Sequence, residues 1–279
     1  LFGIIFFFGF HRLAINGLDK LGNQPFHLQD VILCCNGEIY NVNELKQKYN
    51  LETIGGSDCE IIIHLYKKIG IYETIKVLSG YFAFLLFDTK ENKYHVGRDP
   101  FGVRSLFYGK TKEGKFAWSS EMKSLVGLVD SKTIQCFPPG HMWSSCSKKF
   151  TIYYPYEYRL LLKESCFQQE VMNKTFDLLE ESVRKRFLLE RPFGVLLSGG
   201  LDSCIIASLV AKLSNEPIHT FSIGLENSPD IQYAKIMSKH LGSIHHEVIV
   251  NETEMLNVIP RVIYMTETYD VTTIRASVP

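Results

Sequence analysis

The sequence has no excess of charge of either sign. Its 279 residues carry 30 basic and 30 acidic side chains. A balanced chain has no overall field that would attract nucleic acid or an anionic membrane, so we expect neither as a partner and favour small molecules instead. Any binding of phosphate must then depend on a local site.

Long hydrophobic runs and a cysteine framework are also missing. The apolar stretch Leu1–Phe10 has no basic region before it and is shorter than the ~18 residues that span a bilayer, so we predict a buried strand there. Seven cysteines, an odd number without framework spacing, indicate free thiols in a reducing compartment, and no Cys/His cluster has the spacing of zinc ligands. The sequence therefore predicts a cytosolic protein.

The first half of the chain is predicted to be α+β. From Val31 to Ser119, short apolar runs alternate with turn residues, which indicates strands joined by tight turns. Asp58–Lys68 and Ile71–Leu78 place isoleucine and leucine at helical spacing. This spacing indicates two helices that lie against a sheet.

A domain boundary is predicted near Ser165, after Pro138-Pro139-Gly140 and the tyrosine-rich connector Tyr153–Tyr158. It divides the chain into domains of residues 1–164 and 165–279, and 46% apolar content is enough for each to bury a core. Helices alternate with strands in the second domain, which is typical of βαβ units with a parallel sheet. The predicted elements are helix Phe167–Leu189, strand Phe193–Leu197, helix Asp202–Leu213, strand Ile218–Ile223, helix Asp230–Leu241 and strand His245–Val250.

The segment Ser198–Ser203, Ser-Gly-Gly-Leu-Asp-Ser, lies between a predicted strand and the next helix. Doubly wound sheets bind ligands outside the carboxyl ends of their strands. Glycines let the backbone approach an oxyanion, and the start of a helix carries the positive end of its dipole. We predict an anion site, and the alternative is a tight turn with a serine cap. No Walker loop is present, since Gly127–Thr133 lacks its second glycine, so the chain is not a P-loop kinase or GTPase.

This loop resembles the pyrophosphate loop of the N-type ATP pyrophosphatases, which adenylate a carboxyl or carbonyl oxygen and release pyrophosphate. The resemblance implies ATP and Mg²⁺ as cofactors and a partial Rossmann-like α/β domain. It places Asp202 beside the pyrophosphate and its Mg²⁺, with Leu197 and Ile223 flanking the adenine. The implied ATP-binding residues are Leu197, Ser198, Gly199, Gly200, Asp202, Ser203 and Ile223.

The segment Glu267–Ser277 resembles a stretch of the asparagine synthetase family. The resemblance places Thr272, Thr273 and Arg275 near the aspartate substrate and the ATP phosphates, where a guanidinium can hold an anion in bidentate fashion. The alternative is a helix start capped by one of the two threonines, with a solvated arginine.

The segment Cys35–Asn41, Cys-Asn-Gly-Glu-Ile-Tyr-Asn, resembles the glutamine-site motif of class II amidotransferase domains, which have a layered αββα fold, and Arg98–Arg104 matches the same domain. Asn-Gly between apolar runs is also a strong hairpin signal, which is the alternative for the first segment. The resemblance implies that donors at Asn36 and Gly37 form the oxyanion hole. It also implies that Arg12 holds the glutamine carboxylate and that Glu38 and Asp58 meet the amino group.

The family's nucleophile is a cysteine at the mature N-terminus, and Phe2 stands in its likely place. Cys34 and Cys35 lie in an apolar strand and are expected to be core residues. The chain also omits a family segment between Ile5 and Gly9, and it stops before the family's later metal-binding residues and lysine. We therefore expect this chain by itself to hydrolyse no glutamine and to make no asparagine.

The function implied by the resemblance is ATP-dependent amidation of aspartate through β-aspartyl-AMP, with ammonia derived from glutamine. Glutamine, aspartate and ATP are the expected small-molecule partners, and a homodimer is possible. The alternatives are a non-catalytic remnant or nucleotide-binding protein and an enzyme similar to β-lactam synthetase. Either enzyme would release pyrophosphate from ATP, whereas a non-catalytic remnant would bind ATP without releasing pyrophosphate.

Overall fold

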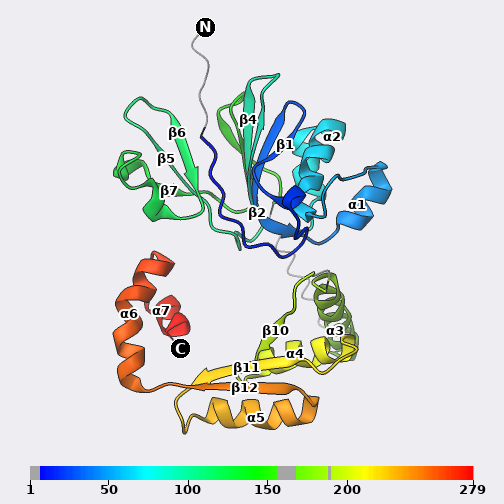
Figure 1. The fold of residues 1–279 in the computed structure, drawn as a ribbon, viewed down its shortest axis with the longest axis vertical. Helices are drawn as coiled ribbons and strands as arrows, with labels where there is room; N and C mark the ends of the chain where they lie inside the picture. The colour runs from blue at the N-terminus through cyan, green and yellow to red at the C-terminus, as the bar shows by residue number, and fades with distance from the viewer. Residues whose placement is uncertain (1–6, 156–167, 188–189, 279) are drawn as a thin grey trace. The chain divides into compact units, whose positions relative to one another are not determined.

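The computed structural model describes residues 7–155, 168–187 and 190–278 (Figure 1). They fall into two compact units, which are residues 7–155 with Glu190, and residues 168–187 with 191–278. Within these ranges, no helix has the length and apolar character needed to cross a membrane.

The first unit contains two antiparallel sheets. The larger has the strand order β1-β2-β3-β4-β8-β9 and the smaller the order β6-β5-β7. The longest ladder joins β2 to β3, from Val31 opposite Asp88 to Ile39 opposite Gly80. The strands are β1 Phe26–Leu28, β2 Val31–Ile39, β3 Gly80–Asp88, β4 Lys93–Arg98, β5 Phe107–Lys110, β6 Phe116–Ser119, β7 Gln135–Cys136, β8 His141–Ser144 and β9 Lys149–Ile152.

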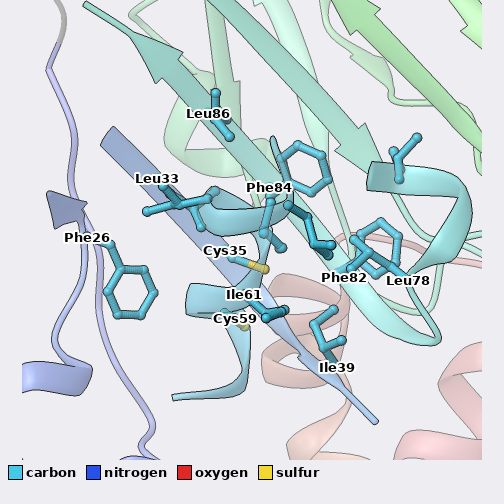
Figure 2. Close-up of a cluster of buried hydrophobic side chains, with 14 of the residues drawn as sticks. Phe26, Leu33, Cys35, Ile39, Cys59, Ile61, Leu78, Phe82, Phe84 and Leu86 are labelled. Carbon is cyan, nitrogen blue, oxygen red and sulfur yellow. The ribbon is translucent and has the colours of Figure 1, made fainter. Parts of the chain in front are cut away.

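Helices α1 (Val42–Tyr49) and α2 (Ile61–Val77) pack beside the larger sheet and share a core with its strands. The first turns of α2 bury a run of isoleucines against apolar side chains of β2 and β3, including Leu33 and Phe84 (Figure 2). The two helices predicted from sequence are the two halves of α2, which kinks at Gly70, where φ is 75°. Short 3-10 helices complete the unit at η1 Lys20–Gly22, η2 Asp58–Glu60, η3 Met122–Leu125 and η4 Ser131–Thr133.

The other face of the larger sheet packs on the smaller one through a second core that is rich in aromatic rings. Trp118 and Trp143 have ring centroids 5.5 Å apart, and Phe137 is fully buried beside them. The described residues therefore form an α-β-β arrangement, which agrees with the predicted α+β class.

The buried strand predicted over Leu1–Phe10 is wrong for residues 7–10, and residues 1–6 lie outside the described part. Residues 7–10 form no strand, and Phe7 is 94% exposed. An apolar run becomes a strand only where a neighbouring strand pairs with it, and the structure shows no such pairing for these residues.

The second unit has a parallel sheet in the order β10-β11-β12, as the βαβ pattern predicted. Its strands are β10 Gly194–Leu196, β11 His219–Gly224 and β12 Ile244–Ile249, and its helices are α3 Gln168–Lys185, α4 Leu201–Leu213, α5 Pro229–Leu241, α6 Glu252–Thr266 and α7 Val271–Ser277. The start of α5 follows from sequence, because Ser228 caps it and Pro229 occupies its first position.

Candidate functional site

A cavity of about 590 Å³ lies in the first unit. Its wall comes from the irregular segment 9–16, the second half of β2 and the turn around η2, with further residues from the region 104–124. These segments are far apart in the sequence and meet only in the folded unit. The cavity brings together Arg12, Asn36, Gly37, Glu38 and Asp58, the residues singled out by the sequence.

Strand β2 carries three of these residues. Asn36 and Gly37 lie inside β2, opposite Ala83 and Phe82, so the hairpin-turn alternative is wrong. A Cβ at Gly37 would overlap the carbonyl oxygen of Tyr81 and the Cα of Phe82. Only glycine allows β2 and β3 to pair this closely beside the cavity.

The η2 turn is tied to β2 by the carboxylate of Asp58. Its Oδ2 accepts the N–H of Ile39 at 2.6 Å. Burial raises the pKa of the Asp58 carboxyl, and the negative charge of Glu38 acts in the same direction, whereas backbone N–H donors partly oppose them. A cationic group placed in the cavity would stabilise the ionised form of Asp58.

The guanidinium of Arg12 is held by the loop that follows it. It donates to the carbonyl oxygens of Asn16 (2.9 Å), Gly17 and Asp19 (3.2 Å) and to Oδ1 of Asn23 (3.2 Å). Among the described residues no carboxylate forms an ion pair with it, so its charge can act on an anion in the cavity.

Cysteines also border the cavity. Cys35 and Cys59 are buried, and Cys59 Sγ donates to the carbonyl oxygen of Gly37 at 3.4 Å. A hydrogen bond with Cys35 and burial raise the pKa of Cys59 well above its ordinary value, and burial raises the pKa of Cys34 to about 11. The thiols of Cys34 and Cys59 therefore stay protonated at neutral pH and are poor nucleophiles. Cys35 is a core residue, as inferred from sequence, whereas Cys34 is only half-buried. The position of Phe2 lies outside the described residues.

The glycine-rich loop of the second unit joins β10 to α4. Gly199 has φ 79°, and a Cβ there would overlap the backbone of α5 at Asp230 and Ala234, whereas a Cβ at Gly200 would meet only the Ser198 hydroxyl, at 3.4 Å. The Oγ atoms of Ser198 and Ser203 lie 3.0 Å apart.

The start of α4 has no side-chain cap, so the serine-capped alternative is wrong. Its first backbone N–H groups are therefore left for an anion. Asp202 lies exposed in this first turn, and no other acidic residue accompanies it there.

The two residues expected to flank adenine differ in exposure. Leu197 is 1% exposed and packs with Ala207 and Ala234, while Ile223 is 43% exposed. Of the two, Ile223 presents side-chain surface to a ligand.

Thr272, Thr273 and Arg275 lie on α7. The helix is capped by Asp270, whose Oδ2 accepts both the N–H and the hydroxyl of Thr273, so the alternative in which a threonine is the cap is wrong. In the part of the chain that the structure describes, no hydrogen bond or ion pair joins these residues to the glycine-rich loop.

Arg104 and Gln24 are among the cavity residues to which sequence reasoning gave no role. Arg104 belongs to a motif that was recognised, but it was given no role, and the structure places its guanidinium 3.3 Å from Glu38. The side-chain amide of Gln24 accepts the N–H of Cys35 at 2.6 Å and donates to the carbonyl oxygen of Cys35 at 2.9 Å. No local sequence pattern marks Gln24.

Comparison with known proteins matches both units. A family model described as a glutamine amidotransferase domain matches residues 5–152, and one described as asparagine synthase matches residues 174–279. The glutamine-hydrolyzing asparagine synthetase of Cricetulus griseus is 40% identical over 301 residues, which cover 97% of this chain and 53% of that protein. Asparagine synthetase 1 of Arabidopsis thaliana, also glutamine-hydrolyzing, is 40% identical over 96% of this chain and 47% of its own length.

Among solved structures, the glutamine phosphoribosylpyrophosphate amidotransferase of B. subtilis complexed with ADP and GMP matches with a TM-score of 0.41 and 21% identity, over 82% of this chain and 49% of that one. The chain spans about half the length of the curated relatives it matches. Given both family matches and these relatives, the chain belongs to the glutamine amidotransferase domain family and carries an asparagine synthase domain after it.

Proposed function

We propose that the cavity of the first unit binds L-glutamine and that the second unit binds ATP, in a protein that amidates aspartate to asparagine through β-aspartyl-AMP. The observation that carries the proposal is the cavity itself, which gathers four side chains of matching chemistry and the backbone of Gly37 from distant segments. The similarity to glutamine-hydrolyzing asparagine synthetases supports the same substrates.

In this proposal the cavity recognises each end of the amino acid separately. Arg12 attracts the α-carboxylate, while Glu38 and Asp58 receive the α-ammonium. The Asn36 side chain and the Gly37 N–H donate to the oxygen of the side-chain amide, where negative charge develops when the amide is attacked. These residues bind and orient glutamine, and the attacking group must come from elsewhere.

ATP and Mg²⁺ fit the glycine-rich loop by its chemistry. The uncapped start of α4 and the serine hydroxyls are donors for phosphate, and the open space at Gly200 admits it. Asp202 would hold Mg²⁺, which prefers one or two carboxylates together with phosphate oxygens. Bound Mg²⁺ would neutralise charge on the phosphates.

We assign Thr272, Thr273 and Arg275 to the aspartate and the phosphates, and Leu197 and Ile223 to the adenine. A cytosolic location and a homodimer remain part of the proposal. So does the division into domains of residues 1–164 and 165–279.

The test is calorimetric titration of L-glutamine into the chain and two variants. Asp58→Asn removes a charge in the cavity, and Asp30→Asn makes the same change at an exposed position outside it. We expect Asp58→Asn to weaken binding about tenfold or more, because a hydrogen-bonded charge is lost, and Asp30→Asn to leave it unchanged. No binding by the unmodified chain, or equal binding by both variants, would refute the assignment.

A further inference from the structure

The loop between β4 and β5 is built around a buried carboxylate. Asp99 is fully buried, and its side chain accepts the N–H groups of Phe101, Val103 and Arg104 at 3.0, 3.0 and 3.1 Å. Three charge-assisted hydrogen bonds fix the backbone of the loop. The N–H side of Arg104 is thereby held in place.

The carbonyl side of Arg104 is held by Arg98. This guanidinium is buried and donates to the carbonyl oxygens of Arg104 (2.7 Å), Gly102 (2.7 Å) and Phe137 (2.6 Å). Gly102 has φ 67°, and a Cβ there would press on the Arg98 guanidinium, so the sequence permits this close approach. Arg98 and Asp99 together immobilise the backbone from which the Arg104 side chain extends.

The side chain of Arg104 reaches the cavity. Its terminal nitrogen donates to Glu38 Oε1 at 3.3 Å, and the two side chains are 34% and 18% exposed. Its Nε is buried and has no hydrogen-bond partner among the described residues. The other cavity arginine, Arg12, is bound to loop oxygens instead, so Arg104 is the cation that the structure places on Glu38.

Glu38 needs such a partner. It lies close enough to Asp58 for their negative charges to interact, and both line one cavity. An ion pair with a fixed guanidinium offsets this repulsion and restricts the rotation of a long side chain before the ligand arrives.

We propose that Arg104 is a positioning residue of the amino-acid pocket, which holds the Glu38 carboxylate where it receives the α-ammonium of L-glutamine. This inference rests on the proposed function and adds a residue whose effect is specific to one end of the ligand. Arg104 acts through Glu38, so its influence depends on the ammonium group.

The experiment is calorimetric titration of the full chain at a mildly acidic pH with three probes. They are L-glutamine, 4-carbamoylbutanoate, which lacks the ammonium, and L-glutaminamide, which lacks the carboxylate. The variants are Arg104→Met, Arg104→Lys and Lys132→Met, the last removing a charge from an exposed position outside the cavity. Arg104→Met should raise the Kd of L-glutamine and of L-glutaminamide about tenfold and leave that of 4-carbamoylbutanoate unchanged. Arg104→Lys should restore part of the loss, and Lys132→Met should change nothing.

Two results would overturn the inference while leaving the proposed function in place. One is unchanged affinity of Arg104→Met for L-glutamine. The other is weakened binding of 4-carbamoylbutanoate with normal binding of L-glutaminamide, which would make Arg104 a carboxylate ligand. No binding of any probe by the unmodified chain would refute the proposed function as well.

If Arg104→Met does not fold, Arg104→Gln takes its place. The background variant Glu38→Gln gives a second measurement, because the effect of changing Arg104 must vanish there. A full effect in that background would also overturn the inference.

Discussion

His95 makes the stability of the first unit depend on pH. It lies on β4 between Leu86 and Ser144, is 5% exposed, and has a tilted ring contact with Tyr66. Neither ring nitrogen has a hydrogen-bond partner among the described residues. Burial, with a smaller effect of Lys93, lowers its pKa from 6.5 to about 4, and Asp88 opposes them.

The sign and the size of this pH dependence of stability follow from the linkage between proton binding and folding. The folded unit favours the neutral imidazole, so the contribution of His95 is complete above pH 6.5 and is lost as the pH falls from 6.5 toward about 4. A tenfold change in proton affinity corresponds to about 1.4 kcal/mol. The free energy of unfolding should therefore fall by about 3 kcal/mol across this window because of His95 alone.

The assay is urea unfolding followed by tryptophan fluorescence. The chain has two tryptophans, Trp118 and Trp143, and both lie in the second core of the first unit, so the signal reports on that unit. Asp58, whose pKa is raised, contributes in the opposite direction, but it titrates alike in every variant.

The matched pair of variants is His95→Phe and His27→Phe, the second at an exposed position of β1. His95→Phe should lose most of the pH dependence between about pH 6.5 and about pH 4 and stay within ~1.5 kcal/mol of the unmodified chain at neutral pH, because the change nearly conserves volume. His27→Phe should keep the full dependence. Equal slopes in His95→Phe and the unmodified chain would refute the argument.

Three further outcomes are expected. Gly37→Ala should lower the free energy of unfolding of the first unit by ~1 to 3 kcal/mol through overlap with β3, and unchanged urea unfolding would contradict the packing argument. Asp202→Ala should weaken Mg²⁺-dependent binding of ATP or pyrophosphate, measured by calorimetry with Asp177→Ala, the same change at an exposed position of α3, as the control, and unaltered affinity would count against the loop assignment. Asn251→Ala should remove the capping box of α6 and lower the stability of the second unit by ~1 kcal/mol, measured by circular dichroism during thermal unfolding, and an unshifted transition would show that the cap contributes nothing.

The sequence by itself predicted the elements whose signals are local. The alternation of helices and strands predicted α4, α5 and the parallel order of β10 and β11, because hydrophobic periodicity acts within a few positions. The resemblance of Cys35–Asn41 to the glutamine-site motif also singled out the residues of β2 that line the cavity, whereas the close packing of Gly37 against β3 became visible only in the structure. The strand prediction failed at residues 7–10 because apolar content does not specify a pairing partner.

Only the tertiary structure decided which residues meet. Arg104 and Glu38 are separated by 66 positions, and their contact depends on the buried Arg98 and Asp99 that fix the intervening loop. That His95 has no hydrogen-bond partner in the described part of the chain likewise arises from packing between β4 and α2, and a histidine in the sequence carries no sign of it. Local pattern determines the elements, whereas long-range packing determines the charges and the solvation of the side chains they bring together.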